Sequence, residues 1–217
     1  MWSKPRSCSG GRWPCSRRRS PTTASSCQVY LGREATEEKA KSLGPESNLV
    51  HFACHGLLDE RFPLNSALVL TLPEQKAEGR ENGLLQAWEI FESVRLDADL
   101  VTLSACDTAL GREMAGEGLV GLTRAFQYAG ARSVVATLWG VSDISTARFM
   151  ESFYGYLRAG KTKDEALRAA QIDQIRKKTG ASHPFHWAAF QLTGTGGRRP
   201  IPGAPGFLEA GSYMEKV

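Results

Sequence analysis

Two stretches, Asn48-Leu-Val-His-Phe-Ala-Cys-His55-Gly56 and Leu100-Val-Thr-Leu-Ser-Ala-Cys106-Asp107-Thr108, decide how this chain folds. Each begins with a short apolar run that contains β-branched residues, which is typical of a strand buried in a parallel sheet. The first run leads to His55 and the second to Cys106. Because the carboxyl ends of parallel strands share one edge of a sheet, and that edge holds ligands in open α/β folds, we expect His55 and Cys106 to lie close together there.

Strand-like and helix-like segments alternate between Gln28 and Gly194. The apolar patterns predict strands at 29–31, 49–54, 67–72, 100–105, 133–138 and 187–192, and helices at 36–43, 84–94, 117–129, 144–158 and 162–178. Gly130 is expected to end the third of these helices, and the capping box Thr162-Lys-Asp-Glu165 to open the last. This alternation predicts an α/β fold, with a mostly parallel sheet and helices on both of its faces.

The two ends of the chain differ in composition from the middle. Residues 1–27 are rich in Ser, Arg, Pro and Gly and contain six basic residues and no acidic one. We therefore predict a disordered or misassigned segment at 1–27, one folded domain at 28–194 and a disordered tail at 195–217. A transit peptide is a second interpretation of the Arg-rich, Ser-rich start. The net charge of +4 comes from this start, so residues 28–217 are close to neutral.

Several classes of function are disfavoured by the sequence. A near-neutral domain does not predict a nucleic-acid surface, and no apolar run is long enough to cross a membrane. The five cysteines include no C-x-x-C pair, so neither a disulfide framework nor a metal site is expected, although Cys54, His55 and Cys106 could approach one another. Gly116-Glu-Gly118 lacks the lysine of a phosphate-binding loop. We expect no cofactor.

The chemistry of His55 and Cys106 suits acyl transfer. A thiolate is a strong nucleophile, and an imidazole beside it can take the thiol proton and return it to a leaving amine. The backbone N–H groups of Gly56 and Cys106 are candidates for an oxyanion hole, because glycine lets a carbonyl approach its backbone closely. The alternative for each residue by itself is structural, as a buried histidine bonded to a carbonyl or as a small buried hydrophobe.

Three residues near the expected site could contact a substrate side chain: Asp107, Trp139 and Asp143. Asp107 follows the cysteine, and Trp139 and Asp143 follow the strand predicted at 133–138. Each also has a structural alternative. Asp107 could cap a turn, Trp139 could be a core aromatic, and Asp143 could be the N-cap of the next helix.

Four blocks resemble one known family in their order along the chain. They are His51-Phe-Ala-Cys-His55-Gly56, Leu103-Ser-Ala-Cys106-Asp-Thr108, Ala136-Thr-Leu-Trp139-Gly-Val-Ser-Asp143 and His183-Pro-Phe-His-Trp-Ala-Ala-Phe190. Together they are similar to the CHAT domain, a caspase-like family whose members often follow tetratricopeptide repeats. The resemblance implies the three-layer caspase–hemoglobinase-like fold and a dyad matched by His55 and Cys106. In caspases, too, the histidine precedes the cysteine by roughly 50 residues.

The resemblance also implies a bacterial, cytoplasmic protein that acts on a polypeptide substrate and is activated by a sensor or a tetratricopeptide-repeat partner. The family's first strand should precede Val29, and residues 1–27 cannot supply it, so a truncated domain with that strand missing is expected.

The resulting prediction is a cysteine endopeptidase that hydrolyses peptide bonds through a thioester acyl-enzyme. One alternative is an inactive or regulatory caspase-like interaction module, including a gene fragment. Another is a cysteine hydrolase of small amides.

Overall fold

A six-stranded sheet forms the centre of the protein in the computed structural model, which describes residues 28–72, 82–104, 106–107, 117–177, 182–197 and 211–215. The strands are β1 (Gln28–Tyr30), β10 (Gly211–Glu215), β2 (Leu49–Ala53), β6 (Leu100–Leu103), β8 (Ser133–Thr137) and β9 (Phe190–Gly194), in this spatial order. All neighbouring strands are parallel except β8 and β9, which are antiparallel. The mostly parallel α/β sheet predicted from the sequence is therefore confirmed.

The strands β6 and β8 are buried along their whole length, as their continuous apolar sequences predict. Strand β2 is buried at Leu49, Val50 and Phe52. These three strands are neighbours, and they run from one end of the sheet to the edge where His55 and Cys106 follow.

A second, smaller sheet begins where the carboxyl ends of β2 and β6 leave the first. It contains β5 (Leu84–Gln86), β4 (Ala67–Val69), β3 (His55–Leu57) and β7 (Cys106–Asp107), in this order. Strand β3 is antiparallel to β4 and parallel to β7. Strands β2 and β6 are therefore neighbours in the large sheet, and their continuations β3 and β7 are neighbours in the small one.

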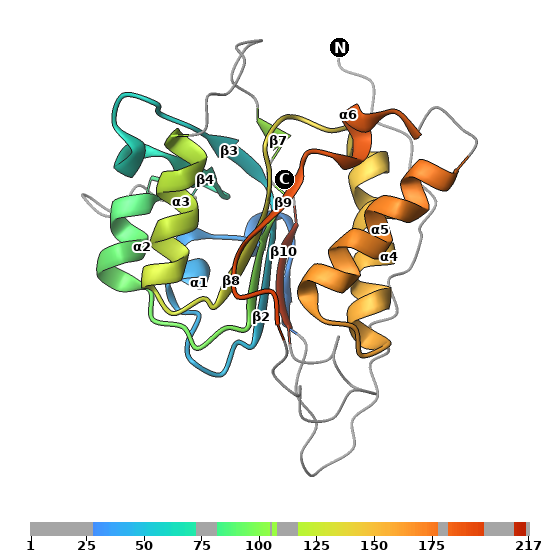
Figure 1. The fold of residues 1–217 in the computed structure, drawn as a ribbon. Coiled ribbons are helices and arrows are strands. Elements are labelled where there is room, and N and C mark those ends of the chain that lie inside the picture. Colours follow the sequence, from blue (N-terminus) through green and yellow to red (C-terminus); the bar gives the residue numbers. More distant parts are fainter. Residues whose placement is uncertain are drawn as a thin grey trace.

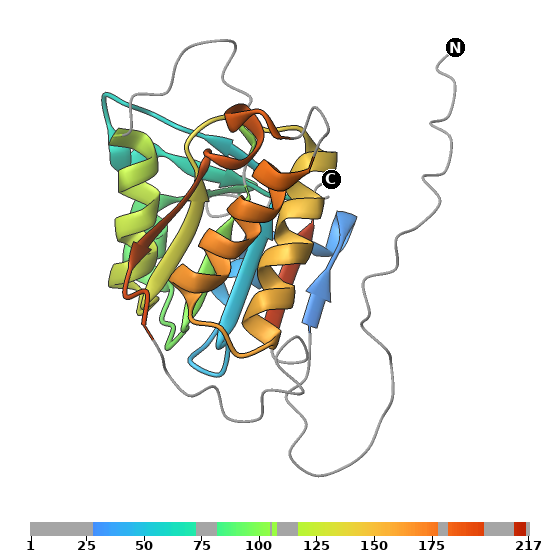
Figure 2. The same ribbon diagram turned by 45° about the vertical axis from the view of Figure 1, so that its right-hand side comes forward.

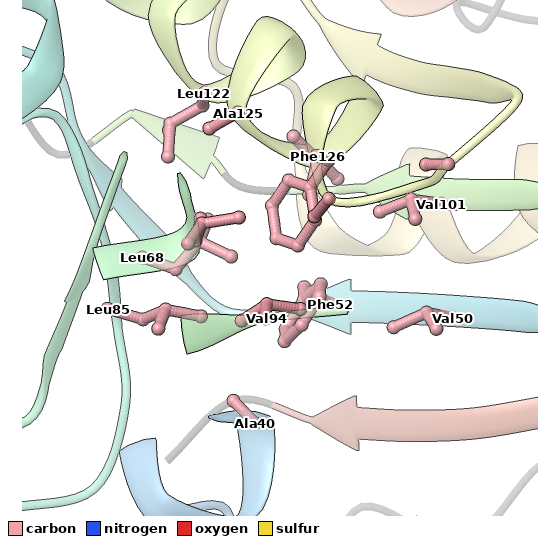
Figure 3. Close-up of a cluster of buried hydrophobic side chains, with 14 of the residues drawn as sticks. Ala40, Val50, Phe52, Leu68, Leu85, Val94, Val101, Leu122, Ala125 and Phe126 are labelled. Carbon is pink, nitrogen blue, oxygen red and sulfur yellow. The ribbon is translucent and has the colours of Figure 1, made fainter. Parts of the chain in front are cut away.

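One face of the large sheet is covered by α1 (Glu37–Lys41), α2 (Ala87–Ser93) and α3 (Glu117–Tyr128). Figure 1 shows them on the opposite side of the sheet from α4 and α5. The core between them contains Phe52 and Phe126, whose ring centroids are 5.4 Å apart, together with Leu68 and Leu85 from the small sheet (Figure 3). Two short 3-10 helices, η1 (Gly32–Glu34) and η2 (Pro63–Asn65), complete this part of the chain.

The other face is covered by α4 (Asp143–Arg158) and α5 (Lys163–Arg176), which lie in front of the sheet in Figure 2. Their core is separate and is centred on Phe149, whose ring stacks on that of Phe190 with centroids 3.9 Å apart. The predicted capping box is present, because Thr162 accepts from the backbone of Glu165 and Glu165 accepts from that of Thr162.

Several element boundaries differ from those predicted: the strand predicted at 67–72 ends at Val69, residues 55–57 form an additional strand, and two further differences change the type of element. Residues 84–86 pair with β4 before the helix begins at Ala87, because that helix needs the Gln86 cap and the small sheet needs an edge strand. Residues 184–187 form the short helix α6 (Pro184–Trp187), so the last predicted strand begins only at Phe190. Proline at the first helical position favours that turn. The predicted segment 1–27 and most of the loop expected at 74–82 lie outside the described residues.

The tail predicted to be disordered at 195–217 contains strand β10, and the expectation is corrected for this stretch. Strand β10 lies between β1 and β2 and is parallel to both, as Figure 2 shows. The physical reason is that β1 and β2 both present unpaired backbone groups toward this gap, and five extended residues satisfy both edges at once. A strand from the end of the chain therefore occupies an interior position in the sheet.

We predict that Gly130→Ala destabilises the fold strongly. Gly130 has φ of 114°, and a Cβ built there would lie 1.9 Å from the carbonyl oxygen of Leu96. The backbone strain alone costs about 1–3 kcal/mol, and relief of the clash requires the Leu96 backbone to move. Urea denaturation would measure the loss.

Gly155→Ala is the matched control. Gly155 lies inside α4 with open space around its Cβ position, so alanine should stabilise the helix by about 0.5–1 kcal/mol. Equal stabilities of the Gly130→Ala variant and the parent would contradict the structure at this turn.

Candidate active site

His55 and Cys106 are register partners in the structure. Phe52 of β2 pairs with Leu103 of β6, and three residues later His55 of β3 pairs with Cys106 of β7. Neighbouring strands are about 4.8 Å apart, so the backbones of the two residues are in direct contact. The sequence placed both residues at strand ends; the structure places each at the first residue of a short continuing strand.

The imidazole of His55 is partly buried, and its Nδ1 atom is fully shielded from solvent. No hydrogen-bond partner contacts this Nδ1 within the part of the chain that the structure describes. A buried polar atom without a partner is costly, and a catalytic role is one explanation for such an atom; Arg132 Nε, Thr146 Oγ1 and His186 Nδ1 share this property elsewhere in the described residues. The unsatisfied nitrogen therefore marks His55 as a candidate for proton transfer.

Gly56 is buried in the middle of the small sheet, where it pairs with Leu68 on one side and Asp107 on the other. Its neighbour Cys54 is 3% exposed and packs in the core with Phe52. The two cysteines that are close in space thus differ in environment, because Cys54 belongs to the core while Cys106 belongs to the strand next to His55.

A largely buried polar network precedes this pair on the same two chain segments and was not recognised from the sequence. His51 of β2 forms hydrogen bonds through Nε2 with the Ser104 hydroxyl and through Nδ1 with the Tyr154 hydroxyl, the latter 3.1 Å long. The Tyr154 hydroxyl also donates to Oγ1 of Thr102 at 2.9 Å. One sequence feature could have indicated this network: His51 is a polar residue inside an otherwise apolar strand, four positions before His55.

Burial lowers the pKa of His51 from 6.5 to about 3, because the charged ring would lose its hydration. His51 is therefore neutral near pH 7, with one ring nitrogen donating and the other accepting. This neutral form fits a network of hydroxyl groups, which provide both donors and acceptors.

Trp139 lies at the same edge, two residues after β8. Its Nε1–H donates to the carbonyl oxygen of Phe185 at 2.9 Å, and the two rings are 6.5 Å apart. Phe185 belongs to α6 and is 47% exposed. The strands β2, β6 and β8 are adjacent, so Trp139 and α6 flank the edge that carries His55 and Cys106.

Asp143 is the first residue of α4 and is exposed. The N-cap is Ser142, whose hydroxyl accepts from the N–H of Ser145 at 3.4 Å, so the alternative role of Asp143 as the cap is incorrect. Asp107 is brought beside Gly56 by strand pairing.

Within the described residues, no group of three His, Cys, Asp or Glu side chains could hold a metal ion. The same described residues contain no helix long and apolar enough to span a membrane.

We predict that His51, which is partly buried and neutral, makes the fold sensitive to mild acid. Its folded-state pKa lies below the unfolded value, so the unfolded state binds a proton first as the pH falls, and stability declines between about pH 6.5 and pH 3. Between pH 7 and pH 5 this residue should account for roughly 2 kcal/mol of lost unfolding free energy. The variant His51→Asn cannot be protonated and should lack that part of the loss, as measured by urea denaturation at both pH values. The same pH-dependent loss in both proteins would be inconsistent with a His51 that is neutral in the folded state.

Comparison with known proteins agrees with the fold and with the motifs. A family model, "CHAT domain", matches residues 17–195. Tetratricopeptide repeat protein 28 of Mus musculus is 32% identical over 201 residues, and that of Homo sapiens is 28% identical over 202. Each alignment covers 78% of this chain and 8% of the relative, so the chain matches only a small part of either protein. The family match extends over most of the chain, including both strands that carry His55 and Cys106, and the protein is thus a member of the CHAT domain family.

Proposed function

We propose that this CHAT domain is a caspase-like cysteine endopeptidase with Cys106 as the nucleophile and His55 as the general acid and base. The observation that carries the proposal is the direct pairing of His55 with Cys106 across two parallel strands. The unsatisfied Nδ1 atom of His55 supports it, because a structural histidine would be expected to have a partner there.

The proposed reaction has two stages. His55 takes the thiol proton of Cys106, and the thiolate attacks the peptide carbonyl. The carbon–nitrogen bond then breaks, His55 gives the proton to the leaving amine, and a thioester remains on Cys106. Water, deprotonated by His55, cleaves this thioester and restores the thiol. Backbone N–H groups of Gly56 and Cys106 would stabilise the oxyanion of both tetrahedral intermediates.

The finer assignment of the fold, the three-layer caspase–hemoglobinase-like architecture, belongs to the same proposal. Its support is the parallel sheet with a separate core on each face and a small sheet at its carboxyl edge. We also propose that the domain acts in the cytoplasm on a polypeptide and is activated by a sensor or a tetratricopeptide-repeat segment. The repeats in the names of both relatives support the last point.

Substitution of the dyad tests the proposal. Cys106→Ala should reduce the hydrolysis of fluorogenic peptides to background, and His55→Ala should lower kcat by about 10²–10⁴-fold, the usual contribution of general acid–base catalysis. Cys54→Ala is the control, because this cysteine lies in the core and should affect activity only mildly. A Cys106→Ala variant that cleaves as fast as the parent would exclude this mechanism.

A non-catalytic interaction module is the second candidate. It is favoured by the names of both relatives, which describe repeats and no peptidase. An electrophilic peptide probe that forms a covalent bond with active thiols separates the two. Labelling of the parent that is lost in both Cys106→Ala and His55→Ala indicates an enzyme, while labelling that is equal in the parent and in His55→Ala indicates a module with an ordinary exposed thiol.

The candidate specificity residues predict a preference for arginine before the scissile bond. Asp107 and Asp143 would repel an acidic side chain, and the planar guanidinium of arginine pairs with a carboxylate better than the lysine ammonium does. If Asp107 instead caps the following turn, Trp139 would dominate and leucine or methionine would be preferred. Peptides that vary only at this position distinguish these cases, and Asp107→Asn should weaken arginine selectivity. A preference for aspartate or glutamate would contradict the acidic pocket.

A further inference from the structure

The network formed by His51, Thr102, Ser104 and Tyr154 occupies a specific place in the fold. His51 and Thr102 are register partners in β2 and β6, and Ser104 follows β6 immediately. The same two chain segments continue to His55 and Cys106, which are register partners in turn. Tyr154 reaches the network from α4 on the face of the second core. One helix is therefore tied to both strands just before they reach the dyad.

The hydrogen bonds of the network are mutually dependent. The Tyr154 hydroxyl has one proton and donates it to Thr102, so the same oxygen accepts from Nδ1–H of His51. A neutral ring protonated at Nδ1 has an accepting Nε2, and the Ser104 hydroxyl is placed to donate to it. The Ser104 N–H in turn donates to the carbonyl oxygen of Phe52 in β2 at 3.0 Å. The Ser104 hydroxyl also lies 3.4 Å from that carbonyl oxygen, so it can donate either to His51 or to Phe52.

The burial of the network gives it the capacity to fix a geometry. Thr102 is fully buried, while Ser104 and Tyr154 are 6% and 8% exposed. A shift of β2 relative to β6 would break at least one of these bonds, and an unsatisfied polar group is costly at the buried Thr102, Ser104 and Tyr154. Sliding of these two strands along each other would also move His55 relative to Cys106. The reason is that the pair His51 and Thr102 and the pair His55 and Cys106 lie on the same two chain segments.

We propose that His51 and Tyr154 are positioning residues for the proposed dyad: through Thr102 and Ser104 they hold β2 and β6 in the register that brings His55 to Cys106. The inference rests on the proposed function. It assigns no contact with substrate to either residue, and it gives the helix α4 a role in the alignment of the site.

The test compares two tyrosines of one helix. Tyr154→Phe removes the network hydroxyl and keeps the ring. Tyr156→Phe is the matched control, because its hydroxyl donates at 2.7 Å to Asp173 of α5, and so belongs to the contact between the two helices and not to the sheet. Thr102→Val removes the hydroxyl group that accepts from Tyr154, at nearly constant side-chain volume. All variants are made in the full chain.

For Tyr154→Phe we expect kcat to fall by about 10- to 100-fold with KM within about twofold of the parent, since a small misplacement of reacting groups costs rate and not substrate binding. The pH dependence of Cys106 alkylation by iodoacetamide, followed by peptide mass spectrometry, should shift to higher pH as the imidazole is displaced. The double variant Tyr154→Phe/Thr102→Val should be little slower than Tyr154→Phe, because the two partners share one interaction. Tyr156→Phe should match the parent in rate and in thiol titration.

Three outcomes overturn the proposal in distinguishable ways. If the parent hydrolyses peptides and Tyr154→Phe has the same kcat and the same thiol titration, the network has no positioning role and the dyad stands. If the parent neither hydrolyses peptides nor shows a Cys106 thiol that titrates below the ordinary range, the dyad itself is absent and the inference fails with it. An equal loss of kcat in Tyr156→Phe would show a general effect of helix packing and would also contradict the proposal.

Discussion

The rest of the structure depends on one constraint, the continuous parallel pairing of two chain segments through two sheets. Leu49–Ala53 pairs with Leu100–Leu103 in the large sheet, and His55 and Gly56 pair with Cys106 and Asp107 in the small one. A slip of one residue in either sheet would turn every buried side chain of a strand to the opposite face. The two cores, one on each face, therefore oppose any change in the register that brings the candidate site together.

Polar interactions hold the small sheet against the first core. Lys41 of α1 donates to Glu37 and Glu89, at 2.5 Å and 2.7 Å, and the other carboxylate oxygen of Glu37 accepts from the N–H groups of Asn82 and Gly83 just before β5. Burial lowers the pKa of Lys41, but its hydrogen bonds to both glutamates outweigh this, so the net shift is upward. The ammonium remains charged, and α1, α2 and β5 are linked through it.

The sequence predicted the parts of the fold that local patterns encode. The sequence correctly located the apolar runs of β6 and β8, the capping box at Thr162 and the helix end at Gly130. Each of these features depends on residues that are close to one another along the chain. Strand β5 was read as the first turn of a helix, since its assignment depends on pairing with β4 across a loop. Nor could the sequence explain Gly121 inside α3, where a Cβ would lie 2.5 Å from the carbonyl oxygen of Pro63, a residue that is distant along the chain.

For the candidate site, the order and strand-end positions of His55 and Cys106 were readable, because an apolar run followed by a reactive residue is a local signal. The polar network of His51 was not readable, since His51 gains its partners from Ser104, just after β6, and from Tyr154 of α4, and no neighbouring residue in the sequence reveals them. Strand β10 was missed for a related reason. A stretch of five residues after a Gly-rich and Pro-rich segment becomes a strand only when two other strands leave a gap of the right width.

The interior position of β10 has a consequence for how the protein is made. Gln28 joins the large sheet only by pairing with Ser212, which is synthesised after every other described strand. Until then, β2 has an open edge on that side, and β1 has no partner among the described strands. A nascent chain emerging from the ribosome would expose that edge for the whole time that the intervening residues are being added, and contacts between such distant residues form slowly. During the period between translation of β2 and the arrival of β10, the chain therefore exposes a strand edge of the kind that favours pairing with other chains.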